Sequence, residues 1–267
     1  MSAKFRLDVE LVRRGLAKSR ESAIHAIEAG EVLVNGSVNS KPSSQVNEGV
    51  SITIKSGSEE RYASRGAYKL LGALLEFESL GLSVEGKRAL DAGASTGGFT
   101  DVLLKRGARE VVAVDVGYGQ MVWELQQDPR VKIFDRTNVR HLELEIIGEK
   151  VDVVVADLSF ISLNLVLPAL VSVATQSCDF LLMVKPQFEV GREKLGAGGV
   201  VRDPALRMSA ILQVAQSAEK IGLGTAGIVA SPLPGPAGNV EYFLWLKRGA
   251  PTIDPSKIAQ AIEKGPV

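Results

Sequence analysis

The sequence has little of several features that would place a protein in a specialised class. Its 267 residues include one cysteine, Cys178, and two isolated histidines, His25 and His141. A single cysteine excludes an internal disulfide framework and a zinc site built from several thiolates. We therefore expect a protein of a reducing compartment, the cytoplasm, with no bound metal and with Cys178 buried and inert.

The chain also has no long apolar run and no excess of charge. The longest apolar region, 161–174, is interrupted by Ser162, Asn164, Pro168 and Ser172, and no charged amino-terminal region precedes an apolar stretch of signal-peptide length. We therefore expect a soluble protein with no membrane partner. The 31 Lys and Arg residues balance 31 Asp and Glu residues, so a nucleic-acid partner would have to be held by local positive patches.

What the sequence does contain is a glycine-rich segment that predicts a ligand site. Residues 88–100 run Arg-Ala-Leu-Asp-Ala-Gly-Ala-Ser-Thr-Gly-Gly-Phe-Thr, which is typical of a strand, a tight turn and a helix. The glycines would let backbone approach a ligand where a β-carbon would collide. Ser95 occupies the place of the second glycine of a G-x-G-x-x-G dinucleotide cradle, which disfavours a pyrophosphate site. A tight turn that binds no ligand is the alternative.

An acid follows this segment at the end of the next predicted strand. That strand covers 110–115 and ends in Asp115. Ligands of open α/β sheets lie beyond the carboxyl ends of the strands. Asp115 is therefore predicted to bind two ribose hydroxyls of a cofactor.

Residues 1–59 predict a small α+β domain. Helical periodicity covers 6–16, and Ser19 is a predicted cap of a second helix that ends before residue 30. The dipeptide Asn35-Gly36 predicts a hairpin within 31–38, and alternation predicts a further strand over 46–55.

The first 20 residues of this domain carry an excess of positive charge. Two acids, Asp8 and Glu10, stand against six cations: Lys4, Arg6, Arg13, Arg14, Lys18 and Arg20. Phosphate groups are the natural partners of such cations, because Lys and Arg bind the nucleic-acid backbone without regard to sequence. A solvated helix face is the alternative.

After a linker at 60–63, residues 64–267 predict a doubly wound α/β domain. Beyond the two strands already placed, apolar runs predict strands at 131–134, 151–156, 180–184, 225–231 and 240–247, with helices between most of them. The segment 232–239 is too short for a crossover helix, so the last of about seven strands must run antiparallel. A terminal helix is predicted over 255–264.

Two carboxylates and two amines occupy positions where this sheet would bring them together. Asp157 and Lys185 follow the fourth and fifth strands, Lys69 lies on the helix that opens the domain, and Glu241 lies in the last strand. We expect the four to border one cleft. An ion-pair network that only holds the sheet edge together is the alternative.

Several motifs resemble known families. Residues 6–23, with the following Gly30-x-Val-x-Val-Asn-Gly, resemble the RNA-binding domain named after ribosomal protein S-four. The set Lys69, Asp157, Lys185 and Glu241 resembles the K-D-K-E set of FtsJ-like ribose 2′-O-methyltransferases. Together with Ser64-Arg-Gly-Ala-Tyr-Lys-Leu and Lys185-Pro-Gln-Phe-Glu, these motifs make nearly the whole chain resemble the TlyA or haemolysin A family.

The resemblance implies a Rossmann-like methyltransferase that uses S-adenosylmethionine to methylate cytidine ribose in ribosomal RNA of the small or large subunit. It implies that the cofactor is held by residues of the glycine-rich segment and the strand ends: Asp91, Gly93, Ser95, Gly97, Gly98, Phe99, Asp115, Thr137, Asn138 and Asp157. Lys185 is the candidate base, and the opposite role, a charged Lys185 that polarises the hydroxyl, stays open. Arg65 joins the six amino-terminal cations as a candidate RNA contact, and the glycine-rich loop 191–202 adds Arg192, Lys194 and Arg202.

Three other functions fit parts of the sequence. The chain could be a non-catalytic ribosome assembly factor, or a membrane-active haemolysin, although no segment has the length to insert. Base methylation is disfavoured, because the fourth strand is followed by Asp157-Leu-Ser-Phe and not by an Asn-Pro-Pro-Tyr-like run that would hold a base amine.

Overall fold

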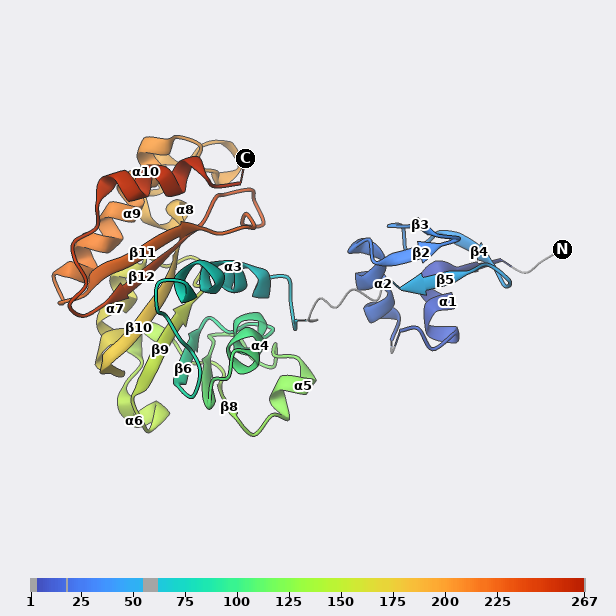
Figure 1. Cartoon of the computed structure of the whole chain (residues 1–267), viewed down its shortest axis with the longest axis horizontal. Coiled ribbons are helices and arrows are strands. Elements are labelled where there is room, and N and C mark those ends of the chain that lie inside the picture. The colour runs from blue at the N-terminus through green and yellow to red at the C-terminus, as the bar shows by residue number, and fades with distance from the viewer. Residues whose placement is uncertain (1–3, 18, 55–61, 267) are drawn as a thin grey trace. The chain divides into compact units, whose positions relative to one another are not determined.

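The computed structural model describes residues 4–17, 19–54 and 62–266 (Figure 1). The chain divides into two compact units, residues 1–61 and 62–267. The small unit contains strands β1 (Lys4–Arg6), β2 (Val32–Val34), β3 (Ser37–Val38), β4 (Gln45–Asn47) and β5 (Ile52–Ile54) and helices α1 (Leu7–Arg13) and α2 (Arg20–Glu28).

The small unit is the predicted α+β domain, with two differences in its elements. A three-stranded antiparallel sheet, β3-β2-β5, and an antiparallel pair, β1-β4, pack with the helices around a core that includes Leu7, Leu11 and Ile27. Asn35 and Gly36 both have positive φ, as the hairpin requires. The first helix ends at Arg13 and not at 16, and the strand predicted over 46–55 is two strands, because a turn interrupts the alternation where Val50 N bonds to Asn47 O.

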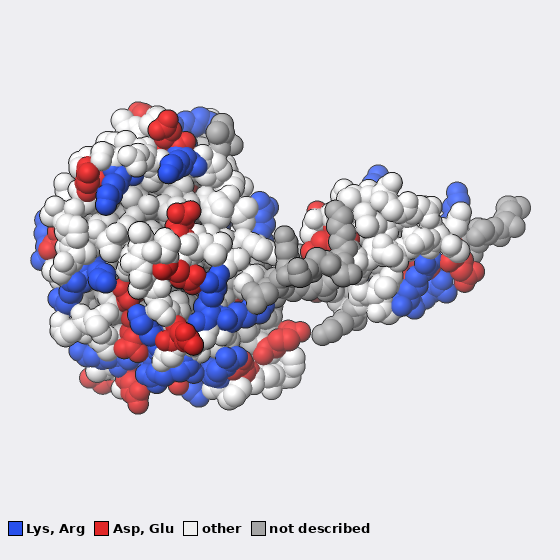
Figure 2. All heavy atoms as spheres, viewed as in Figure 1, with Lys and Arg blue, Asp and Glu red and all other residues white. Residues whose placement is uncertain are grey.

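Buried acids organise the amino-terminal cations. Asp8 is fully buried and accepts hydrogen bonds from Arg6 at 2.9 and 3.0 Å and from Arg20 at 3.1 Å. Hydrogen bonds from Arg6 lower the pKa of Asp8 to about 2. Figure 2 shows Lys and Arg side chains of the small unit gathered beside acidic ones.

Glu10 repeats this arrangement two residues later. It is fully buried and accepts from Arg13 at 2.7 and 2.8 Å and from Arg14 at 2.6 Å, and the bonds from Arg13 lower its pKa to about 2. Two arginines share each buried acid, so the Asp8 cluster keeps one net positive charge, while in the Glu10 cluster Arg13 also pairs with the exposed Glu48 at 3.4 Å. Lys4 is exposed, and Lys18 lies outside the described residues.

The large unit is the predicted doubly wound sheet. Its strands are β6 (Arg88–Ala92), β7 (Glu110–Val114), β8 (Val131–Phe134), β9 (Val151–Ala156), β10 (Ala174–Val184), β11 (Gly224–Ala230) and β12 (Tyr242–Lys247). They lie in the order β11-β12-β10-β9-β6-β7-β8. The prediction of an antiparallel last strand is confirmed, since β12 pairs antiparallel with both β10 and β11 while β6 to β10 pair in parallel.

Helices cover both faces of this sheet (Figure 1). They are α3 (Ala67–Glu78), α4 (Gly98–Lys105), α5 (Trp123–Gln126), α6 (Leu144–Ile147), α7 (Leu163–Ser172), α8 (Pro186–Glu189), α9 (Pro204–Glu219) and α10 (Pro255–Glu263), with 3-10 turns at Val139–His141 (η1), Arg192–Lys194 and Ala197–Gly199. One core cluster contains residues of α7, α9 and α10, and the other contains residues of α3 and α4. Buried valines and leucines of the central strands contribute to both clusters, as expected for parallel strands covered on two sides.

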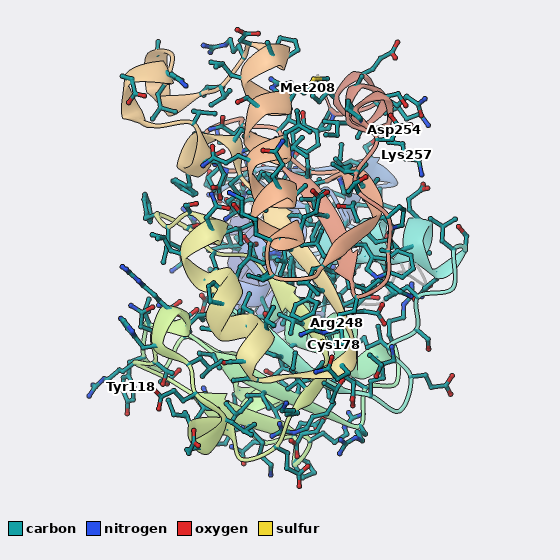
Figure 3. All side chains as sticks on the ribbon, turned by 90° about the vertical axis from the view of Figure 1, so that its left-hand side faces the viewer. Tyr118, Cys178, Met208, Arg248, Asp254 and Lys257 are labelled. Carbon is teal, nitrogen blue, oxygen red and sulfur yellow. The ribbon has the colours of Figure 1, made fainter. Side chains whose placement is uncertain are left out.

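Two strand boundaries differ from the sequence prediction. Strand β10 begins at Ala174, six residues before the predicted start at 180, and its pairing with β9 shifts register between Ala174 and Asp179. Strand β12 begins at Tyr242, so Glu241 lies just before the strand and not within it. Cys178 is buried on β10 (Figure 3), and burial raises the pKa of its thiol.

The buried Glu10 cluster predicts an acid-sensitive small unit. In Glu10→Gln, neutralising the acceptor of three charged hydrogen bonds should lower the stability of α1 and α2 by about 2 kcal/mol near pH 7, measured by amide exchange in the full chain. Since the Glu10 pKa falls from 4.5 to about 2 on folding, the difference should shrink as pH drops through that range. Glu48→Gln, which removes one exposed pair with Arg13 at 3.4 Å, is the control. Equal amide exchange in Glu10→Gln and Glu48→Gln would contradict a stabilising role for the buried Glu10.

Candidate active site

Four parallel strands bring carboxylates to one edge of the large sheet. Asp91 lies near the end of β6, while Asp115, Asp135 and Asp157 each directly follow β7, β8 and β9. The chain passes from β6 to β7 and β8 on one side and then crosses to β9 on the other side of β6. Such a reversal leaves a crevice between the loops, where ligands of open α/β sheets bind.

The glycines of the segment after β6 are explained by contacts within the protein. A β-carbon on Gly93 would lie 2.6 Å from the carbonyl oxygen of Asp157, and one on Gly97 would collide with Leu125. A β-carbon on Gly98 would meet Ser64 and lie 3.0 Å from Ala67 N. These glycines therefore let the loop fit against the β9 end, α5 and the start of α3. Gly93 and Gly97 also have φ of +89° and +93°, a region that favours glycine.

Asp115 holds the rim of this loop. Its Oδ2 accepts from Ser95 N at 2.8 Å and its Oδ1 from Gly117 N at 2.7 Å. Ser95 is exposed, has φ of +45° and contacts Gln120 through its hydroxyl at 3.1 Å. Each carboxylate oxygen of Asp115 keeps a second lone pair, so the predicted ribose contact is compatible with these bonds.

Asp91 lies beneath the loop. It is fully buried; Thr100 donates to its Oδ2 at 2.7 Å, and its Oδ1 has no hydrogen-bond partner among the described residues. Burial, with smaller contributions from Asp157 and Asp115, raises the pKa of Asp91 to about 7. Asp91 therefore supports the loop from below.

The other predicted cofactor residues lie at different depths. Phe99 is buried in the core, with its ring centroid 6.0 Å from that of Phe243. Thr137 N bonds to Asp115 O at 2.9 Å, which places Thr137 beside the rim. Asn138 is exposed and caps η1 by accepting a hydrogen bond from Arg140 N at 3.0 Å. This turn is sufficient to explain why an asparagine occupies the position.

The four predicted catalytic residues form two ion pairs. Lys185 Nζ lies 2.6 Å from Asp157 Oδ1 and donates to Ser159 Oγ at 3.0 Å. Lys69 Nζ donates to Glu241 Oε2 at 2.6 Å. Both lysines and Glu241 are buried.

A cavity of about 690 Å³ connects the two pairs, because Lys185 and Glu241 both line it. Glu241 Oε1 has no hydrogen-bond partner among the described residues. A β-carbon on Gly235 would lie 2.6 Å from that oxygen, so the segment between β11 and β12 packs directly on the second pair. An arrangement of this kind can orient a hydroxyl and receive its proton.

The same cavity is lined by residues that the sequence did not single out. Phe160 is 91% exposed with φ of +63°, and its ring lies 5.2 Å from that of Phe188. Asn239 is buried and binds the loop between α8 and α9, accepting from Val201 N at 2.8 Å and donating to Gly199 O at 3.0 Å. The only sequence signals for these residues were their neighbours Asp157, Lys185 and Glu241.

The remaining predicted cations are exposed. Arg65 lies in the turn before α3, and Lys194 and Arg202 lie on the loop between α8 and α9. The side chain of Arg192 lies outside the described part of the chain. In the same described part, no group of three His, Cys, Asp or Glu side chains could hold a metal ion, and no helix is both long and apolar enough to span a bilayer.

Comparison with known proteins gives two family matches. Residues 62–248 match the FtsJ-like methyltransferase model, and residues 5–52 match the S4 domain model. The chain is 56% identical to the 16S/23S rRNA (cytidine-2′-O)-methyltransferase TlyA of Mycobacterium tuberculosis, over 92% of this chain and 91% of that protein.

Two further relatives carry a different name. Hemolysin A of Brachyspira hyodysenteriae is 36% identical over 89% of this chain and 98% of its own length. A solved structure described as a putative hemolysin from Streptococcus thermophilus has a TM-score of 0.75 and 39% identity, and the match covers 99% of this chain and 96% of that one.

The raised pKa of Asp91 predicts a pH-dependent stability. Between 3.8 and about 7, the folded state holds a proton that the unfolded chain has released, so stability should fall with rising pH by up to about 1.4 kcal/mol per unit. Asp91→Asn cannot titrate, and its stability relative to the native protein should therefore rise across this window in denaturant titrations.

Asp128→Asn is the control, because hydrogen bonds from Arg130 lower the pKa of Asp128 from its ordinary value of 3.8. Asp128 is then largely ionised in both the folded and the unfolded state from pH 4 to 7, so the difference between this variant and the native protein should stay nearly constant across that window. A difference between Asp91→Asn and the native protein that does not vary from pH 4 to 7 would show that Asp91 is ionised in the folded state.

Proposed function

Because this chain belongs to the FtsJ-like methyltransferase family, we propose that it methylates the 2′-hydroxyl of a cytidine in ribosomal RNA, with S-adenosylmethionine as the methyl donor. The observation that carries this proposal is the convergence of the Lys185–Asp157 and Lys69–Glu241 pairs on one cavity. A ribosomal RNA substrate would place the protein in the cytoplasm, and its activity would act on ribosomal subunits or their precursors.

The residues at the strand edge fit the proposed cofactor. S-adenosylmethionine carries an ammonium and a sulfonium, and Asp115, Asp135 and Asp157 make the edge acidic. Asp115 and Thr137 would hold the adenosine end, while Gly93, Ser95 and Gly97 would line the methionine end. When bound, this group would supply an activated methyl that an oxygen nucleophile can attack, with the thioether S-adenosylhomocysteine as the leaving group.

Lys185 is proposed to act on the ribose hydroxyl. A hydroxyl is a weak nucleophile near neutral pH, so a positioned group must take its proton as the new bond forms. Lys185 has its Nζ fixed by Asp157 and Ser159 and lines the cavity. As the base, Lys185 must be neutral when it reacts, and the rate should then rise with pH until the amine has lost its proton.

The second pair is proposed to set the charge beside this amine. Lys69 lies on α3 and is bound to Glu241, which follows the segment between β11 and β12. Glu241 lines the same cavity as Lys185, so the second pair brings its charges to that cavity. Because Lys69 is buried and bonded at 2.6 Å, its position would not depend on the substrate.

The substrate side of the cavity suits a nucleotide. Phe160 and Phe188 present aromatic surface beside Lys185, and unstacked bases bind aromatic side chains in RNA recognition. The S4 domain, with the Arg6–Arg20 and Arg13–Arg14 clusters, would hold structured ribosomal RNA by its phosphates. Arg65 and the exposed cations of loop 191–202 would add contacts near the reaction.

Replacement of Lys185 tests the proposal. Lys185→Ala should abolish labelled methyl transfer to isolated ribosomal subunits, because the amine proposed to take the proton is removed. Its affinity for S-adenosylmethionine should stay within about tenfold, or roughly 1.4 kcal/mol. Mapping of the product by mass spectrometry should place the methyl on a cytidine 2′-oxygen.

Lys150→Ala, which removes an exposed lysine just before β9, at the opposite end of that strand from Asp157, should keep full activity. Undiminished transfer by Lys185→Ala, or a methyl group on a base, would overturn the proposal. A single-turnover rate that falls as the lysine deprotonates would assign Lys185 the polarising role instead.

A further inference from the structure

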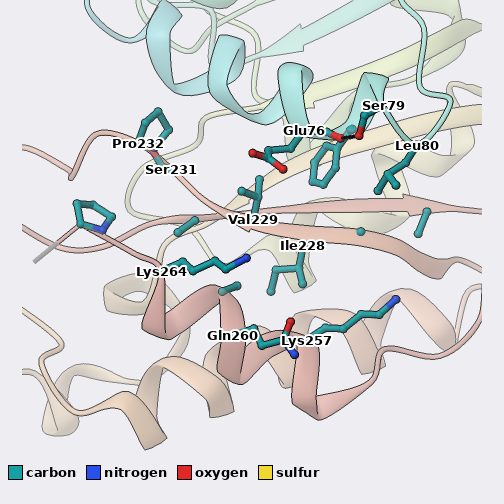
Figure 4. Close-up of a pocket in the computed structure, with 16 residues that line it drawn as sticks. Glu76, Ser79, Leu80, Ile228, Val229, Ser231, Pro232, Lys257, Gln260 and Lys264 are labelled. Carbon is teal, nitrogen blue, oxygen red and sulfur yellow. Dashed lines mark hydrogen bonds between the residues drawn. The ribbon is translucent and has the colours of Figure 1, made fainter.

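Strand β11 forms one edge of the seven-stranded sheet and lies in a groove of about 620 Å³. The floor of the groove is formed by 226–231, one wall by the carboxyl-terminal half of α3, and the other wall by α10. Figure 4 shows the strand between these two helices. No residue that lines this groove lines the active-site cavity.

The backbone on the outer side of β11 is available for pairing. Ser231 N bonds inward to Glu241 O, and alternation along an antiparallel strand therefore turns the N–H and C=O groups of Ile228 and Ala230 outward. Among the described residues, neither amide donates to a turn or a loop. Thr225 N, at the start of the strand, already bonds outward to Pro251 O at 2.8 Å, which shows that this edge accepts a neighbouring extended segment.

The edge lacks the devices that usually protect a sheet edge. The strand reads Gly-Thr-Ala-Gly-Ile-Val-Ala, without charge or proline, whereas exposed edges normally carry lysine, proline or a covering element. A register shift occurs only near its start, between Thr225 and Gly227. The free part therefore has regular strand geometry.

The two walls carry opposite charge. Lys257 and Lys264 line the groove from α10, and Glu76 lines it from α3. In Figure 4 the side chains of Glu76 and Lys264 extend into the space between the helices. None of the three has an ion-pair partner among the described residues.

The walls also lie on opposite faces of the sheet. Ile228 and Ala230 pack in the core cluster that contains residues of α10, while Ala226 and Val229 pack in the cluster that contains residues of α3. A strand added to β11 would alternate its side chains between these faces. One set would meet two lysines, and the other set would meet Glu76 with apolar Phe77 and Leu80.

We propose that the β11 groove binds an extended segment of a partner protein as an added strand, with acidic side chains facing α10 and a basic side chain between apolar ones facing α3. Main-chain bonds to Ile228 and Ala230 supply affinity, and the charged walls select the sequence. A second copy of β11 is a poorer occupant, because its neutral side chains leave all three charges unpaired.

A labelled peptide, Thr-Val-Glu-Lys-Glu-Val-Thr, tests this proposal with the full chain. Fluorescence anisotropy should show saturable binding, and amide exchange at Ile228 and Ala230 should slow when the peptide is bound. The peptide with exchanged charges, Thr-Val-Lys-Glu-Lys-Val-Thr, should bind about tenfold more weakly to the native protein. The triple variant Glu76→Lys, Lys257→Glu, Lys264→Glu should reverse this preference.

Methylating the peptide nitrogens that face β11 should abolish binding, while methylating those on the outer side should not. A midpoint of thermal unfolding equal to that of the native protein establishes that the triple variant is folded. Equal binding of the two peptides, unchanged exchange at Ile228 and Ala230, or displacement of the peptide by an RNA oligonucleotide would overturn the proposal. A concentration-dependent dimer that protects the same amides without peptide would do so too.

Discussion

Two lysine–carboxylate pairs set the geometry on which the large unit depends. Lys185 and Asp157 come from neighbouring parallel strands, so the sheet itself brings them together. Lys69 and Glu241 are 172 residues apart, and their pair exists only if α3 lies closely on the sheet. Burying a charge without its partner is costly, so packing and ionisation in this region depend on each other.

Three glycines allow α3 to approach so closely. A β-carbon on Gly72 would lie 2.7 Å from Pro232, and one on Gly227 would lie 2.8 Å from the ring of Phe77. A β-carbon on Gly98 would meet Ser64 and the backbone of Ala67, at the start of the helix. Helix α3 is therefore fixed against the segment after β11, against β11 itself and against α4. These close contacts at the three glycines hold the helix that carries Lys69, so the position of Lys69 does not depend on its ion pair alone.

Much of this arrangement could be predicted from the sequence, because strand ends and short connections are local features. The apolar runs before Asp157 and Lys185 predicted two neighbouring strand ends, and the short segment 232–239 predicted the antiparallel β12. Contacts between distant segments could not be predicted in this way. No pattern in the sequence indicates which amine pairs with which acid, or that Gly93 meets the backbone of Asp157. The amino-terminal charge count likewise missed that Asp8 and Glu10 would be buried beneath their arginines.

The central claim is that the two pairs act as one catalytic unit. A double-mutant cycle on the single-turnover rate, with the acid of each pair replaced in Asp157→Asn, Glu241→Gln and the double variant, tests it most directly. Residues that act as a unit show strongly non-additive effects, so the double variant should be about as slow as the slower single variant. Losses that simply multiply, with each substitution acting on its own, would show that the Lys69–Glu241 pair only supports the fold.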